Sequence, residues 1–344
     1  MGRRRQALAR GSLLAILLVA LSGCGGGTAS NGDKADEPAP QLRPAPEPGQ
    51  APVPTNLPAG EVIQLGDGGP EGMVADPVTG MVAVALRQPN RLALVDGRAG
   101  QLVTTVPMPG AARHLQLAAP GGPVLVPGED TDIVARVALP GGEVVGQVQV
   151  GRQPHDAAAV GDRLFVADEL GGTTSVVEND KVVRAFPEPV QPGNVAVAGG
   201  RVGVVDVRGA NLYVYDLAGT QSLPPVAAGD GPTHAAADGQ GRLVVTDTRG
   251  SAVLLFRLDP PTLVERVPLP GAPYGLAVDA TRDMLWVALS ATNQLVGFRL
   301  SEGPPEKMAT FDTVRQPNSV AVDVETGRVF VASATDGTLQ IIDP

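Results

Sequence analysis

The sequence has little cysteine, histidine or aromatic side chain: one Cys, three His and 3% aromatic residues among 344. Because Cys24 is the only cysteine, no disulfide can form within one chain. Scarce aromatics leave few surfaces on which bases or sugars can stack. Lys and Arg, 26 in all, are outnumbered by 36 Asp and Glu. Nucleic-acid binding needs clustered basic residues, so we expect no nucleic-acid partner.

The N-terminus has the pattern of an export signal. Four arginines within residues 1–10 precede an apolar run over 13–21, which is too short to span a bilayer as a mature helix. The tetrapeptide ending at Cys24, LSGC, resembles a bacterial lipobox, which implies cleavage before Cys24 and lipidation of its thiol. An ordinary signal peptide that contains a cysteine is the alternative, and Arg4-Arg5 leaves both Sec and twin-arginine export open. We expect residues 1–23 to be a lipoprotein signal peptide.

Two further expectations follow for the mature chain. Residues 24–60 are rich in Gly and then in Pro and show no periodic apolar face, which predicts a disordered tether. Removing residues 1–23 lowers the formal charge from −10 to −14, which disfavours binding to anionic lipid surfaces through basic residues. The lipid on Cys24 is therefore the expected membrane contact, and we place the protein on the outer, extracytoplasmic face of the cell membrane.

Residues 61–344 contain an internal repeat. Its units begin with a proline, or once an alanine, followed by an apolar alternation, at intervals of 38 to 44 residues. The seven anchors are Pro70, Ala112, Pro154, Pro192, Pro232, Pro273 and Pro317. A period near 40 with short alternating segments and almost no helical periodicity predicts an all-β, seven-bladed β-propeller with four-stranded blades. A β-sandwich, the competing all-β fold, lacks a fixed repeat.

Two units carry a resemblance to a known family. VVGQVQVGRQPHDAAAVGDRLFVADE and TVRQPNSVAVDVETGRVFVAS resemble the YVTN or YncE-like bacterial propellers, to which NHL-repeat propellers are related. The resemblance covers residues 61–344 and implies the propeller fold. It does not imply one activity, because such propellers include binding proteins, scaffolds and enzymes.

The last unit predicts how the ring closes. After Pro317 the sequence supplies three strands, NSVAVD, RVFVAS and TLQIID, whereas an unassigned strand, EVIQL, stands at residues 61–65 before the first unit. An unpaired strand edge favours aggregation. We therefore expect residues 61–65 to pair with residues 338–342 and to complete the last blade.

Two sets of loop residues should meet on one rim of the central channel. The first set occupies the two positions after each anchor, and all three histidines of the chain fall there: His114, His155 and His234, with Asp156 beside His155. The second set ends each second strand, and three consecutive units place aspartate there, at Asp168, Asp206 and Asp247. Arg208 and Arg249 follow two of these aspartates.

Each residue type has an ordinary structural explanation beside the functional one. A histidine before an inner strand can be a solvated residue of the channel mouth, and an aspartate in a loop accepts backbone N–H bonds. Taken together, the nine residues predict a ligand site at the rim: His114, His155, Asp156, Asp168, Asp206, Arg208, His234, Asp247 and Arg249.

Three chemistries compete for this rim. No HxH or HExxH spacing fixes a metal, so we predict none, and no motif predicts a cofactor. A rim enzyme resembling streptogramin lyases or lactonases is the alternative function, although no later histidine completes the lyase spacing that runs from His155 to Glu169. The favoured prediction is a monomeric, non-catalytic binding or scaffold module, with a small polar ligand or an envelope protein as partner.

Overall fold

The computed structural model describes residues 42–344, and within this range every regular element is a β-strand. No helix in the described part of the chain is long and apolar enough to cross a membrane. The predicted signal peptide and Cys24 lie outside the described residues.

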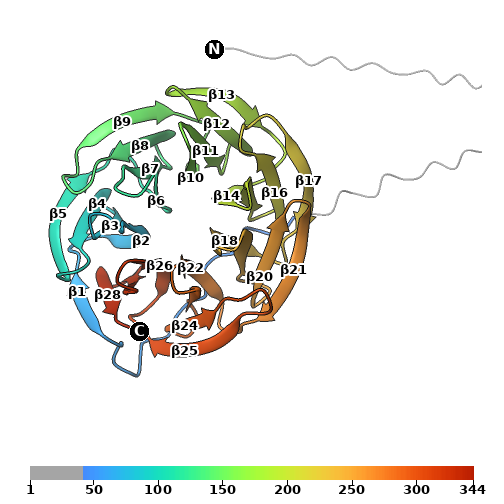
Figure 1. Cartoon of the computed structure of the whole chain (residues 1–344). Helices are drawn as coiled ribbons and strands as arrows, with labels where there is room; N and C mark the ends of the chain where they lie inside the picture. The colour runs from blue at the N-terminus through green and yellow to red at the C-terminus, as the bar shows by residue number, and fades with distance from the viewer. Residues whose placement is uncertain (1–41) are drawn as a thin grey trace, which may run out of the picture. The chain divides into compact units, whose positions relative to one another are not determined.

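Seven four-stranded antiparallel sheets form the blades of a ring, which confirms the predicted β-propeller (Figure 1). The inner strands line the channel: β2 (Gly69–Ala75), β6 (Gln116–Leu117), β10 (Pro154–Val160), β14 (Pro192–Ala198), β18 (Pro232–Ala237), β22 (Pro273–Asp279) and β26 (Pro317–Val322). The second strands are β3 (Met81–Arg87), β7 (Val124–Gly128), β11 (Arg163–Asp168), β15 (Arg201–Asp206), β19 (Arg242–Asp247), β23 (Met284–Leu289) and β27 (Val329–Ser333).

Two further strands complete each blade on its outer side. The third strands are β4 (Arg91–Asp96), β8 (Ile133–Val137), β12 (Thr173–Glu178), β16 (Asn211–Asp216), β20 (Ala252–Leu258), β24 (Gln294–Arg299) and β28 (Thr338–Ile342). The outer strands are β5 (Gln101–Pro107), β9 (Val144–Gln149), β13 (Lys181–Phe186), β17 (Ser222–Ala227), β21 (Pro261–Pro268), β25 (Glu306–Asp312) and β1 (Glu61–Gln64).

The ring closes as the sequence predicts. Strand β1 pairs antiparallel with β28, with Glu61 opposite Ile341 and Gln64 opposite Thr338. The first described strand therefore supplies the outer strand of the seventh blade, and the edge of β28 is covered.

The core lies between blades rather than inside one sheet. The middle strands are buried on both faces, so β3 is buried over Met81–Leu86 and reads as a continuous apolar run. Side chains from adjacent blades share each cluster; Val84 of blade 1 packs in one cluster with Phe330 and Ile341 of blade 7. Burying this apolar surface, at roughly 25 cal/mol per Å², fixes the blades side by side around the channel.

Residues 42–60, which we call the strap, differ from the free tether that the sequence predicts. The strap has no strand of its own but lies against the ends of blades 5 to 7 (Figure 1). Gly49 N–H donates to Ser290 Oγ at 2.8 Å, and Ala51 N–H donates to Gln316 Oε1 at 2.9 Å. Gln316 Nε2 in turn donates to Gly49 O at 2.7 Å. Side-chain amides and hydroxyls of the propeller thus satisfy the strap's backbone.

Candidate functional site

The three histidines gather at one mouth of the channel. They come from blades 2, 3 and 5: His114 precedes β6, His155 lies in β10 and His234 lies in β18. The His114 ring lies 4.6 Å, centroid to centroid, from each of the other two and stacks on His234. Tyr274 at the start of β22 meets the His234 ring edge-on at 4.4 Å. Four of the seven inner segments therefore contribute rings to a single cluster.

A fully buried carboxylate organises the floor of this cluster. Asp156 accepts hydrogen bonds from Gln116 Nε2 at 2.9 Å, Asn194 Nδ2 at 2.7 Å and the backbone N–H of Val195 at 2.9 Å. The N–H of Ala235 donates to Asn194 Oδ1, which fixes the orientation of that amide. These neutral donors satisfy the buried charge without a cation.

The side-chain amide of Asn194 also fixes the tautomer of His114. Asn194 Nδ2 also lies 2.9 Å from His114 Nδ1, and because the amide nitrogen is a donor, Nδ1 accepts. The His114 ring therefore carries its proton on Nε2. The nearest oxygen of Asp156 lies 3.7 Å from Nδ1, too far for a direct hydrogen bond.

His155 is buried and neutral. Its Nδ1 lies 2.5 Å from Gly193 O, and because a carbonyl only accepts, Nδ1 carries the proton. Burial, together with the nearby His114 and Arg113, lowers the pKa of His155 well below its ordinary value. The unprotonated Nε2 faces Glu129, whose Oε1 lies 3.9 Å away.

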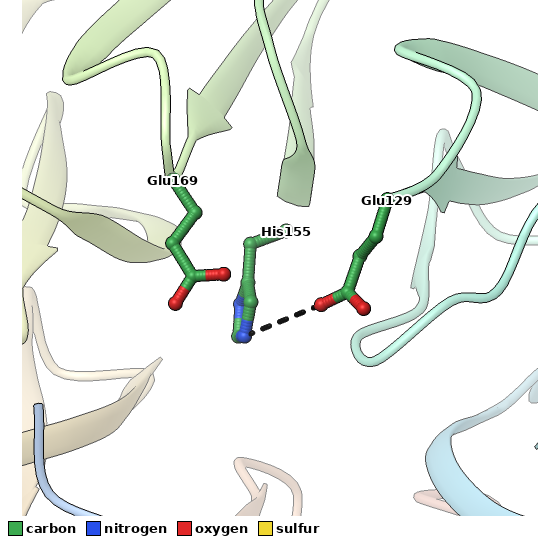
Figure 2. Close-up of side chains that lie close together, drawn as sticks. All are labelled: Glu129, His155 and Glu169. Atoms are coloured by element: carbon green, nitrogen blue, oxygen red, sulfur yellow. Dashed lines mark ion pairs between the residues drawn. The ribbon is translucent and has the colours of Figure 1, made fainter.

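Two glutamates flank His155 at the rim (Figure 2). Glu129 follows β7 and pairs with Arg87 at 2.9 Å and with Arg113 at 3.2 Å. Burial raises the pKa of Glu129, while Arg113 and Arg87 oppose that rise. Burial also opposes the charge of Arg113, but Glu129, Glu71 and other nearby groups raise its pKa.

The second glutamate is held by amides alone. Glu169 follows β11 and accepts from Gln153 Nε2 at 3.0 Å and from Gln191 Nε2 at 2.8 Å. One ligand-type atom from each of Glu129, His155 and Glu169 lies within 4.8 Å of the other two.

A cavity of about 390 Å³ lies in the channel beside the histidines. Arg113, His114, Asp156, Asn194 and His234 line its polar part, and the remainder is largely alanine, valine and leucine. His234 Nδ1 is buried and has no hydrogen-bond partner among residues 42–344. Burial, with His114 and Arg113 nearby, lowers the pKa of His234 well below its ordinary value. A neutral ring with a free polar atom therefore borders the cavity.

The three rim aspartates bind their own blades. Asp206 accepts backbone N–H bonds from Val190 at 2.8 Å and Gly209 at 2.8 Å. Asp247 accepts from Gly231 N–H at 2.7 Å and Gly250 N–H at 3.1 Å in the equivalent loops.

Asp168 differs from these two, because it accepts from two hydroxyls, Thr173 Oγ1 at 2.8 Å and Ser175 Oγ at 2.6 Å. None of the three aspartates hydrogen-bonds to a histidine within the described chain. Asp206 and Asp247 tie the loop before an inner strand and the turn after a second strand to their own blades, whereas Asp168 ties β11 to β12.

Neither predicted arginine lines the cavity beside the histidines. Arg249 donates to the backbone oxygens of Asp230 at 3.0 Å and of Pro44 in the strap at 2.7 Å. Arg208 is exposed. Of the nine predicted residues, the structure brings together His114, His155, Asp156 and His234.

Sequence reasoning missed Glu129 and Arg113 as members of this site. A signal for Glu129 was present: it directly follows the end of a second strand, as Glu169 does one blade later. Arg113 occupies the first position after its anchor, where His155 stands in the next blade. Both residues occupy positions of the repeat that form the predicted rim. The prediction relied on histidine and aspartate at those positions, so glutamate and arginine were left out.

Comparisons with known proteins identify the fold. No protein-family model matches the chain, and no curated protein matches it by sequence. Among solved structures, a chain of Kuenenia stuttgartiensis hydrazine synthase matches with a TM-score of 0.71 and 15% identity, over 81% of this chain and 97% of that one.

Two other solved structures match over similar lengths. Virginiamycin B lyase from Staphylococcus aureus has a TM-score of 0.68 and 14% identity over 82% of this chain and 98% of its own. A chain in a mitotic checkpoint complex has a TM-score of 0.72 and 10% identity, over 89% of this chain and 98% of that chain. Identities this low establish architecture alone, so the chain is a seven-bladed β-propeller similar in fold to virginiamycin B lyase.

Proposed function

We propose that this chain is an extracytoplasmic propeller lipoprotein of the YVTN or YncE-like type that binds a small polar ligand at the histidine-lined channel mouth. Cys24 holds it to the membrane, and binding involves no chemical conversion. The observation that carries the binding role is a cavity of about 390 Å³ lined by His234, whose buried Nδ1 has no hydrogen-bond partner among residues 42–344. Buried polar atoms rarely stay unpaired, so a ligand that pairs with this atom as the His234 ring turns toward the cavity gains a favourable contact.

The floor of the site supports the same role. Asp156 and Asn194 are fully engaged with each other and with backbone groups, which holds the His114 ring in one tautomer and one orientation. A preorganised polar site binds more tightly because little ordering remains to be done on binding. An envelope protein docked on the rim is the other partner consistent with an anchored propeller.

A thermal-shift screen of the full chain against polar metabolites tests this proposal. A ligand at 100 times its Kd should stabilise the folded state by about 2.7 kcal/mol. His234→Phe retains an aromatic ring for stacking but removes Nδ1, so it should abolish the shift while leaving the unliganded midpoint nearly unchanged. Arg208→Ala, at an exposed position after β15, serves as the control and should bind as the wild type does. Wild-type binding by His234→Phe would refute the assigned site.

A rim enzyme is the second candidate, and one observation favours it. Glu129 has a raised pKa and His155 a lowered one, and their side chains lie 3.9 Å apart. A carboxyl group whose pKa is raised, next to a neutral imidazole, is the kind of pair that serves in general acid–base catalysis. Turnover of a screening hit, lost in Glu129→Gln but not in Glu143→Gln, would favour catalysis over binding.

A further inference from the structure

Three hydrogen-bond acceptors, from Glu129, His155 and Glu169, converge at the rim (Figure 2). His155 Nε2 is unprotonated and offers a lone pair, because Nδ1 carries the ring proton. Glu129 is 8% exposed, and its Oε1 accepts no hydrogen bond that meets normal geometry from any residue in the range 42–344. The carboxylate of Glu169 completes the triangle, held from behind by the amides of Gln153 and Gln191. We call these three side chains the acceptor niche.

The size of the niche limits the cation to one that fits between acceptors about 4 to 5 Å apart. The His155–Glu129 separation is 3.9 Å, and all three acceptor atoms lie within 4.8 Å of one another. A primary ammonium directs its three N–H donors tetrahedrally to acceptors about 2.8 Å away, which places those acceptors about 4.6 Å apart. Tetrahedral zinc ligands, at about 2.1 Å from the metal, lie only about 3.4 Å apart. The His155–Glu129 separation of 3.9 Å lies between these two values, so the niche would widen around an ammonium and contract around zinc.

The charges around the niche favour a cation with a single positive charge. Glu71, Glu129 and Glu169 surround the two guanidinium groups of Arg87 and Arg113, which leaves one net negative charge. A monocation neutralises that excess. A divalent ion would overcompensate it next to Arg113, whose Nε lies 3.2 Å from Glu129 Oε1.

We propose that the acceptor niche of Glu129, His155 and Glu169 binds the primary ammonium group of a small amine. This inference rests on the proposed binding function and names the chemical class of its ligand. Arg113 both pairs with Glu129 and lines the channel cavity, so the niche adjoins the space that would hold the rest of the molecule.

Titration of the full chain with n-propylammonium chloride, followed through the imidazole nitrogen resonances of His155, tests the proposal. The Nε2 resonance should shift saturably at pH 7.5, because an N–H donor then occupies its lone pair. Tetramethylammonium carries the same charge but no N–H donor and should bind at least tenfold more weakly. Equal binding of the two cations would overturn the proposed ammonium site.

A matched pair of variants locates the binding. Glu169→Gln should weaken propylammonium binding at least tenfold, whereas Glu143→Gln removes a charge on the exposed hairpin between β8 and β9 and should leave it unchanged. Equal affinities in the two variants would overturn the assignment. So would saturation of the His155 resonance by Zn²⁺ but not by propylammonium, which would make the niche a metal site. A polar ligand that depends on His234 while propylammonium fails would remove the amine inference alone and leave the proposed function standing.

Discussion

Asp168, Asp206 and Asp247 occupy equivalent positions of the repeat, but their carboxylates accept hydrogen bonds from different groups. Asp206 and Asp247 accept several backbone N–H bonds, as loop aspartates commonly do. Asp168 accepts mainly from hydroxyls, and burial raises its pKa to about 6 despite the bonds from Ser175 and Thr173. The sequence places an aspartate at the end of the second strand, but only the surroundings of this residue decide whether its carboxyl group is ionised.

This shift gives a pH-dependent prediction for Asp168→Asn. Because the pKa of Asp168 is about 6 in the folded protein and 3.8 is its ordinary value, the folded wild type binds more protons than the unfolded chain between these values. The free energy of unfolding of the wild type should therefore rise by about 2 kcal/mol relative to that of the variant as the pH falls from 7 to 4. Urea denaturation of both proteins across that range measures the difference; parallel pH profiles would contradict the assigned pKa.

The two buried histidines act in the opposite direction and are common to both proteins. The pKa values of His155 and His234 are lowered in the folded state, so the unfolded chain binds more protons below about pH 6.5. Acidification through that range therefore destabilises the wild type and Asp168→Asn equally. Subtracting one profile from the other isolates Asp168.

At the scale of elements, strand β1 is the piece whose role depends most on distant sequence. It contributes Ile63 to the apolar cluster between blades 7 and 1, and its ladder covers β28. Alternation alone identifies residues 61–65 as a strand. The missing fourth strand of the last unit identifies its partner.

Deleting residues 61–66 should expose the edge of β28 and lower the free energy of unfolding or cause aggregation. Urea denaturation and light scattering measure the two effects. Deleting residues 25–41, before the strap, is the matched control and should leave the midpoint unchanged. Equal losses from both deletions would show that β1 does not close the ring. A control that extends into the strap is unsuitable, because Gly49 and Ala51 are hydrogen-bonded to Gln316.

The strap explains why composition misled the prediction for residues 42–60. A proline-rich chain lacks a periodic apolar face and makes no backbone ladder of its own, which correctly excludes a strand or helix. Its free carbonyl and N–H groups can nonetheless bind side chains of another element. Gln316 and Asn293 provide such partners, and neither is recognisable before the blades are assembled.

At the scale of the whole molecule, the proposed anchor connects the propeller to a membrane through one residue. Cys24→Ala removes the only candidate thiol, so the variant should leave the membrane fraction and appear in the soluble extracytoplasmic fraction. Fractionation and immunoblotting measure the distribution. The ligand-induced thermal shift of the variant should equal that of the wild type, because Cys24 lies outside residues 42–344. Retention of Cys24→Ala in the membrane fraction would exclude the thiol as the anchor.

The sequence by itself determined the propeller, its seven blades and the strand that closes it. These features follow from alternation, spacing and turn residues, which act within or between neighbouring segments. It also placed the histidines on one rim, because the repeat register assigns each residue to a position in its blade.

Only the tertiary structure decided which rim residues meet. Glu129, His155 and Glu169 approach within 4.8 Å because two adjacent blades pack at a particular separation, and Asp168 turns instead toward hydroxyls of its own blade. Side-chain direction around a ring depends on packing between blades that are distant in the chain. A local pattern reports the position of a residue along its strand, but its neighbours across the channel are set by the closure of all seven blades.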